Sequence, residues 1–158
     1  MYRFYVASLS AGPVRLTDLS LVQAEALRAV QTSPKGGHRF DHVIIDEYQD
    51  TNTVQERLVF ALGEGKKNLC VVGDDDQALY RFRGATVENF VEFPERCQAY
   101  YKVNPSTITL HTNYRSLNPI VEVSQAFMKQ TNWNHGKKTY RISKDVAAHR
   151  KEKCPAVF

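Results

Sequence analysis

Cysteine is scarce in this chain of 158 residues, and long apolar runs are absent from it. The three cysteines, Cys70, Cys97 and Cys154, are too few and too far apart for a disulfide framework or a zinc knuckle, and they indicate reduced thiols in the cytoplasm. No apolar run approaches the roughly 20 residues that cross a bilayer, and the first residues lack the sustained apolar core of a signal peptide. We therefore expect a cytoplasmic protein that has no membrane partner.

Excess charge of one sign is also small, since 21 basic and 17 acidic residues give a net charge of +4. Residues 37–100 are nevertheless net acidic, with 7 Lys and Arg against 12 Asp and Glu, whereas residues 137–153 hold 7 basic residues and 2 acidic ones. The acidic middle suits a bound cation and the basic end suits phosphates. The basic end is equally typical of a solvated, partly disordered tail, so both interpretations stay open.

Helical and extended patterns alternate along the chain, without an internal repeat. Apolar spacing predicts helices over 19–30, 53–62, 86–90 and 120–127, with capping boxes at Ser20 with Gln23 and at Thr53 with Glu56, and with Pro94 as a stop for the third helix. Unbroken apolar runs predict strands over 43–45, 69–73 and 107–110, each buried on both faces of a parallel sheet. The strand–helix–strand order implies a right-handed crossover and an open, incomplete α/β layer.

Polar side chains follow each of the three predicted strands. Asp46 and Glu47 end the first, residues 73–77 end the second, and residues 113–115 follow the third. Ligands of an open parallel sheet bind beyond the carboxyl ends of its strands. There, one carboxylate suits Mg²⁺ and its neighbour suits an attacking water in nucleoside triphosphate hydrolysis. A surface turn is the plain explanation for an isolated Asp-Glu pair, but the preceding apolar run and the other strand ends favour a site.

Three stretches in this order carry a family resemblance. Residues 46–52 read DEYQDTN, residues 72–85 read VGDDDQALYRFRGA, and residues 113–116 read NYRS. They resemble the second, third and fourth helicase motifs of the UvrD/Rep family, superfamily-one ATP-dependent DNA helicases that move 3′ to 5′ on single strands. The resemblance spans residues 39–127. It implies an α/β fold, a partial RecA-like P-loop NTPase motor domain with a parallel sheet and flanking helices, and it leaves repair, replication restart and recombination open as roles.

The resemblance also implies roles for individual residues. Asp46 would bind Mg²⁺, Glu47 would activate water, and Gln77 would contact the γ-phosphate of ATP. Arg115 would act as an arginine finger on the same phosphate, and Tyr114 would stack on the adenine. ATP and Mg²⁺ are thus the expected cofactors.

Single-stranded DNA is the expected macromolecular partner. The resemblance assigns base stacking to Phe82, at a position where many relatives carry Trp, and the link between nucleotide state and strand grip to Arg83. Structural alternatives stay open: Phe82 and Tyr114 as core aromatics, and two of the three aspartates at 74–76 as turn or solvated residues. Tyr48 and Gln49 are expected to position the turn at Asp46.

The family's first motif, the phosphate loop Gly-x-x-x-x-Gly-Lys-[Ser/Thr], is missing from the sequence. We therefore expect a piece of a helicase, inactive on its own, with the remainder of the helicase chain as a partner. The expected organisation is a helical lead-in from an inserted subdomain over 1–36, the C-terminal part of the first motor domain over 37–106, a strand and helix leading into the second motor domain over 107–131, and a basic, frayed tail over 132–158.

Two other function classes stay open beside the helicase. One is a non-catalytic module that binds single-stranded DNA or a protein partner. The other is a metal-dependent nuclease built on Asp46, Glu47 and the aspartates at 74–76, which fits less well because such a site has no use for the Gln and Arg phosphate contacts.

Overall fold

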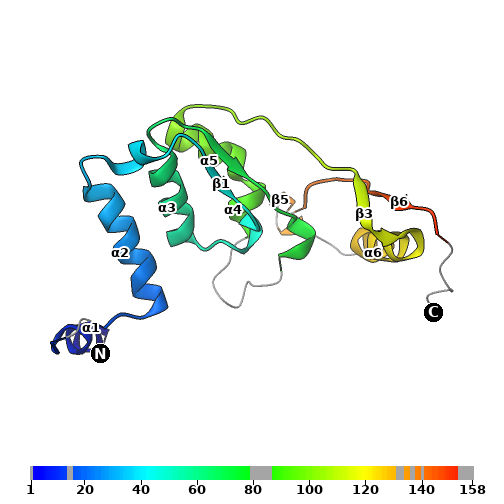
Figure 1. The fold of residues 1–158 in the computed structure, drawn as a ribbon. Coiled ribbons are helices and arrows are strands. Elements are labelled where there is room, and N and C mark those ends of the chain that lie inside the picture. Colours follow the sequence, from blue (N-terminus) through cyan, green and yellow to red (C-terminus); the bar gives the residue numbers. More distant parts are fainter. Residues whose placement is uncertain are drawn as a thin grey trace.

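Six helices, three single-turn 3₁₀ helices and six short strands make up the part of the chain that the computed structural model describes, which is residues 2–13, 16–78, 87–130, 134–135, 138–139 and 141–152. In chain order the elements are α1 (Tyr2–Ser10), α2 (Leu19–Thr32), η1 (Gly36–Arg39), β1 (Val43–Ile45), η2 (Tyr48–Asp50), α3 (Thr53–Gly63), β2 (Leu69–Val71), η3 (Asp75–Gln77), α4 (Val87–Val91), α5 (Phe93–Tyr101), β3 (Thr112–Leu117), α6 (Asn118–Gln130), β4 (Asn134–His135), β5 (Lys138–Thr139) and β6 (Ala147–Arg150). Figure 1 shows an elongated arrangement with α1 and β6 at opposite ends.

Helices α2 and α3 lie side by side (Figure 1), and their N-caps lie two residues and one residue before the predicted caps Ser20 and Thr53. Asp18 caps α2 by accepting a hydrogen bond from the Leu21 amide at 2.8 Å. Asn52 forms the capping box of α3 with Gln55. The predicted boxes at Ser20 and Thr53 were therefore wrong, because Asp18 and Asn52, which are N-caps at least as good, precede these hydroxyl residues and accept the bonds of the first turn.

Strands β1 and β2 pair in parallel, and α3 connects them along the chain, which confirms the predicted strand–helix–strand unit. Their predicted burial on both faces is wrong. Val43 is buried, whereas Ile44 is 70% exposed and its register partner Cys70 is also exposed. Side chains alternate along a strand, and the helices that pack on this sheet cover the face of Val43 only.

The hydrophobic core lies between that covered face and helices α3 and α5. Its buried members are mainly aromatic: Tyr48, Val59, Phe60, Phe93, Cys97 and Tyr101. The Tyr101 hydroxyl donates to the Phe60 carbonyl at 2.6 Å, which satisfies a buried polar pair. Burial raises the pKa of the Cys97 thiol to about 11, so this cysteine is a packing residue.

One prediction between residues 86 and 117 holds and one was wrong. The third predicted helix forms as α4 and ends at Val91, near Pro94 as expected, while Pro94 itself lies in the first turn of α5, where a missing N–H costs nothing. The strand predicted over 107–110 is extended chain without a ladder, and Ile108 and Leu110 are 83% and 79% exposed. The strand begins later, as β3, because its pairing partner is β6, which lies alongside residues 112–117.

Strands β3 and β6 pair in parallel, and helix α6 packs on both. We call β3, α6 and β6 the C-terminal unit; in Figure 1 the extended chain after α5 leads across to it. Strand β6 comes from the segment predicted as a basic tail, and the sequence pattern did not reveal it. Within the described residues, no helix combines the length and the apolarity that crossing a bilayer requires.

Candidate nucleotide-binding site

The carboxyl end of β1 delivers Asp46 and Glu47 into a tight turn. The Glu47 amide donates to Asp46 Oδ1 at 2.9 Å, and both side chains are exposed. Glu47 has φ 51° and ψ 41°, in the left-handed region that a residue with a side chain rarely adopts. A residue keeps such a conformation only where the surrounding structure holds it in place, and residues of this kind cluster at functional sites.

Gln49 ties this turn to the loop after β2. The Gln49 amide nitrogen donates to Glu47 Oε2 at 2.7 Å, and Gln49 Oε1 accepts from the Asp74 amide at 3.1 Å. Gln49 is buried, so the bond to Asp74 fixes the Gln49 side chain, and Gln49 in turn fixes the Glu47 carboxylate. The expectation that Gln49 positions the turn agrees with this geometry.

Gly73 makes room for the same contact. A Cβ atom at this position would lie 2.5 Å from Gln49 Oε1 and 2.9 Å from the Phe90 ring, closer than real contacts allow. Glycine is therefore the residue that lets the loop after β2 close against Gln49.

The network continues from Asp74 to Gln77. Asp74 caps η3, and its Oδ2 accepts from the Gln77 amide nitrogen at 2.7 Å. Glu47 and Gln77 are thus joined through Gln49 and Asp74 at the neighbouring ends of β1 and β2. Two of the three predicted catalytic residues lie in one network.

Arg115 and Tyr114 lie on β3. Asn113 Oδ1 accepts from the Arg115 and Ser116 amides at 2.9 and 2.8 Å and shapes the start of this strand. Tyr114 is 68% exposed, so the core-aromatic alternative was wrong for it. Among the described residues, no hydrogen bond or ion pair joins either side chain to Glu47 or Gln77.

Strand β6 supplies neighbours that the sequence analysis missed. The ring of His149 lies 4.8 Å from that of Tyr114, and Arg150 donates to the Arg115 carbonyl at 3.1 Å. The two predicted DNA contacts, Phe82 and Arg83, lie outside the described residues.

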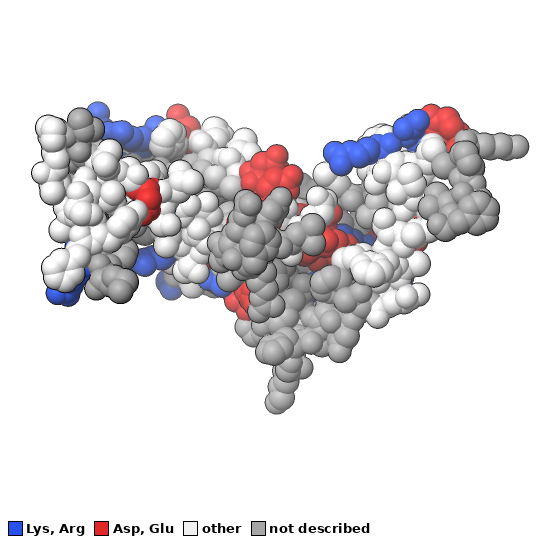
Figure 2. Space-filling view, turned by 90° about the horizontal axis from the view of Figure 1, so that it is seen from below, with Lys and Arg blue, Asp and Glu red and all other residues white. Residues whose placement is uncertain are grey.

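The acidic run Asp74–Asp76 is held by three groups of a later segment, which together we call the clasp. Arg141 bonds both carboxylate oxygens of Asp76, at 2.7 and 3.2 Å, and the Ile142 amide donates to Asp75 Oδ2 at 2.8 Å. The Lys144 ammonium contacts both Asp74 and Asp75. Figure 2 shows that the largest groups of acidic side chains on this face lie near the middle of the molecule.

The clasp shifts the pKa values of Asp74 and of Lys144. Burial alone would raise the pKa of the Asp74 carboxyl, but hydrogen bonds from Lys144 and Gln77 outweigh it and hold that pKa below its usual value. Burial opposes the charge of Lys144, yet its bonds to the aspartates raise its pKa. Both groups are therefore charged at neutral pH. The clasp accounts for the acidic run as a structural feature, and charge complementarity between residues 74–76 and 141–144 was the pattern that could have revealed it.

Asp46 fits the single carboxylate ligand of a magnesium–nucleotide complex, because it is exposed at a strand end and Mg²⁺ keeps several water and phosphate ligands. Across the described ranges, no cluster of three His, Cys, Asp or Glu side chains is arranged to bind a metal ion by itself.

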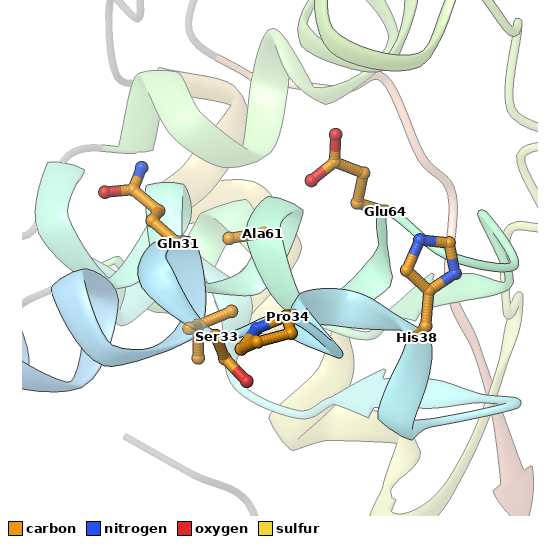
Figure 3. Close-up of a pocket in the computed structure, with 8 residues that line it drawn as sticks. Gln31, Ser33, Pro34, His38, Ala61 and Glu64 are labelled. Carbon is orange, nitrogen blue, oxygen red and sulfur yellow. The ribbon is translucent and has the colours of Figure 1, made fainter.

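A pocket of about 230 Å³ lies elsewhere, between the end of α2, η1 and α3 (Figure 3). Its lining includes Gln31, His38 and Glu64. None of the predicted site residues is among the lining residues that the structure describes, so the pocket is separate from the strand-end network.

These features define a mixed α/β protein with small parallel sheets and with acid and amide groups at the strand ends. The chain belongs to the family of the UvrD/REP helicase N-terminal domain, whose profile matches residues 10–98. Membership in this family confirms the resemblance drawn from the motifs. The family's N-terminal domain has a RecA-like fold.

Individual relatives are ATP-dependent DNA helicases by name. The chain is 43% identical over 91 residues to the ATP-dependent DNA helicase PcrA of Bacillus subtilis, a match that covers 58% of this chain and 12% of the relative. It is 40% identical over 107 residues to the putative ATP-dependent DNA helicase YjcD of the same organism, covering 68% of this chain and 13% of the relative. PcrA of Staphylococcus aureus is 42% identical over 92 residues and is covered to 12% of its length. The matches thus span about an eighth of these relatives.

The range that matches the family covers only part of the predicted site. Asp46, Glu47, Gln77, Phe82 and Arg83 lie inside residues 10–98, and Tyr114 and Arg115 lie beyond them.

Proposed function

We propose that this chain is the part of a 3′–5′ ATP-dependent DNA helicase that carries the water-activating acid and the phosphate-sensing amide. The observation that carries the proposal is the hydrogen-bonded path from Glu47 through Gln49 and Asp74 to Gln77. A path of this kind fixes two polar side chains at adjacent strand ends, where nucleotides bind to open α/β sheets.

Each residue has one task in the proposed reaction. Magnesium–ATP supplies the phosphoryl group, with Asp46 as the protein ligand of the ion. Glu47 accepts a hydrogen bond from the attacking water and orients it. Gln77 donates its amide to the γ-phosphate and exchanges that bond with the one it makes to Asp74.

The other predicted residues complete the site from the C-terminal unit. Arg115 stabilises the charge that develops on the transferred phosphate, and Tyr114 offers an exposed ring to the adenine. Phe82 and Arg83 contact single-stranded DNA. Because the phosphate loop is missing from the sequence, we propose that the remainder of a helicase chain supplies it and that the chain alone is inactive.

The test is a chimera in which residues 10–98 replace the matching segment of Bacillus subtilis PcrA. We expect the chimera to hydrolyse ATP in the presence of single-stranded DNA, and Glu47→Gln to lower kcat by at least about 100-fold, the usual effect of removing a catalytic acid or base. Gln31→Glu is the matched control, because it changes one charge in the separate pocket of Figure 3 and should leave kcat unchanged. An active chimera in which Glu47→Gln also retains full kcat would refute the assignment.

A second candidate is a non-catalytic single-strand-binding module. The exposed Tyr114 ring beside His149 favours it, because stacked aromatic surfaces bind bases without sequence preference. Salt-dependent binding of an oligonucleotide by the isolated chain, weakened by Phe82→Ala, would support this candidate. Absence of binding at low salt would remove it.

The nuclease alternative is disfavoured by the clasp. Lys144 and Arg141 neutralise the acidic run, so its carboxylates are engaged with cationic side chains. Metal-dependent cutting of plasmid DNA by the isolated chain is the direct check.

A further inference from the structure

Lys144 lies at the centre of the clasp and is largely withdrawn from solvent. Its ammonium contacts carboxylate oxygens of Asp74 and Asp75, and Asp76 Oδ2 lies 3.4 Å away. Asp75 is buried, and one of its oxygens also accepts from the Ile142 amide. A cation held by several acidic groups with little solvent exposure keeps a defined position, unlike a surface lysine.

One of these carboxylates also holds Gln77. Asp74 Oδ1 faces Lys144, while Asp74 Oδ2 accepts from the Gln77 amide nitrogen. Asp74 Oδ1 also accepts from the Asp76 amide at 3.1 Å, so Lys144 and this amide together orient the carboxylate. Lys144 is the charged one of the two partners, and the position of the Gln77 amide depends on the carboxylate that it helps to hold.

Lys144 is also tied to the C-terminal unit by the residues that follow it. The Asp145 carbonyl lies 3.0 Å from His111 Nδ1, and the Asp145 carboxylate pairs with Lys129 of α6 at 3.2 Å. Two residues later the Ala147 amide donates to the His111 carbonyl at 2.8 Å, at the start of β6. A shift of the C-terminal unit would move the backbone that carries Lys144.

From this geometry we propose that Lys144 is a positioning residue, which sets the Gln77 amide through Asp74 and so couples the predicted phosphate contact to the C-terminal unit. The proposal deepens the proposed function, because it assumes that Gln77 is the group that meets the phosphate. When the C-terminal unit moves away, Asp74 loses its cation and Gln77 loses a fixed acceptor. Lys144 itself touches no reacting atom.

The protonation of Asp74 reports on this arrangement. The charged groups that face Asp74 are Asp75 and Asp76 from η3, Arg141 and Lys144 from the clasp, and Glu47 by way of Gln49. Burial raises the pKa of Asp74, and the bonds from Lys144 and Gln77 lower it to a net value below the usual one. Removal of the Lys144 charge leaves burial opposed only by the bonds from Gln77 and the Asp76 amide, so the pKa of Asp74 must rise.

The experiment follows the Gln77 side-chain amide of the full 158-residue chain by NMR during an acid titration. In the unaltered chain, the Gln77 amide and the Asp74 carboxyl carbon should shift together, with a midpoint below the usual range of aspartate. In Lys144→Gln that common midpoint should rise, and in Lys144→Arg it should return toward the unaltered value. Arg141→Gln is the matched control, because it removes a charge from the same segment but from the partner of Asp76.

Two results would overturn the proposal. One is a Gln77 amide that titrates independently of Asp74 in the unaltered chain, a measurement that requires no variant to fold. The other is a Lys144→Gln midpoint that stays where it was, or that moves no more than in Arg141→Gln. A separate arm adds magnesium–ATP to the chimera with Bacillus subtilis PcrA, in which the remainder of a helicase chain is present. A Gln77 amide that ignores the nucleotide there removes the phosphate role and leaves the positioning role, which the titration of this chain tests by itself.

Discussion

The buried ion pair between α3 and α5 offers the sharpest stability prediction. Glu56 is 1% exposed, and its Oε2 accepts from Arg96 Nη1 at 2.8 Å. We expect Arg96→Met to lower the free energy of unfolding at neutral pH by about 3 kcal/mol, because removing one partner leaves a buried carboxylate without its cation. This value is at the lower end of the range for buried pairs, since the Arg96 side chain is still 28% exposed.

The loss should depend on pH in a defined direction. Burial raises the pKa of Glu56 above its ordinary value of 4.5, and Arg96 opposes that rise. Without Arg96 the pKa of the folded state rises further, so the folded chain binds a proton that the unfolded chain has released. The deficit of Arg96→Met should therefore be largest above the raised pKa and shrink as the pH falls through it toward 4.5.

Urea unfolding followed by circular dichroism measures both effects, at about pH 7.5 and about pH 5. Arg57→Met is the matched control on the exposed surface of α3 and should change stability by less than about 0.5 kcal/mol. The double variant Glu56→Met with Arg96→Met should recover most of the loss, because no charge is then left buried. A deficit below about 1 kcal/mol at both pH values would refute the reasoning.

Three further predictions concern local contacts, and equilibrium unfolding checks each of them. Tyr101→Phe should cost about 1–2 kcal/mol, because the buried Phe60 carbonyl loses its donor. Gly73→Ala should destabilise by about 1–3 kcal/mol and displace the Gln49 side chain, visible as a shifted Gln49 amide resonance; an unshifted resonance would contradict the packing argument. Asn52→Ala should cost about 1 kcal/mol through loss of the α3 cap, whereas Asn52→Asp should retain most of the stability.

The sequence pattern predicted the elements whose contacts are local. The order of strand, helix and strand over residues 43–71 follows from apolar runs and helical spacing, and both strands form where they were expected. Both helices start at the predicted residues, Leu19 and Thr53, but the capping residues were wrong by two positions and by one, because Asp18 and Asn52 precede hydroxyl residues that are also acceptable caps. A cap is chosen by backbone geometry, which the residue type alone does not determine.

Features that depend on a distant partner were not predictable in the same way. Residues 107–110 have a typical strand composition, but strand β3 forms further along because its ladder requires β6. Strand β6 itself lies in a basic segment whose composition is typical of a solvated tail. The same applies to the clasp, since Lys144 and Asp74 are 70 residues apart and only the folded chain brings them together.

At the candidate site, the acid and the amide could be predicted from motifs, while the way they are held could not. Gln49 was expected to position a turn, but its second bond, to the Asp74 amide, depends on the parallel register of β1 and β2. Arg115 and Tyr114 stay predictions as partners of this site, because their contacts in the described residues are with β6.

At Glu47, the left-handed backbone makes the residue that is best for stability different from the residue that the proposed catalysis requires. Glycine adopts this conformation without strain, so Glu47→Gly would relax the turn by about 1 kcal/mol while deleting the carboxylate. Screening of this chain for heat resistance alone would thus enrich a substitution that abolishes the proposed water activation. Engineers who seek a sturdier form should keep this turn fixed and look for gains at the exposed face of Ile44 instead.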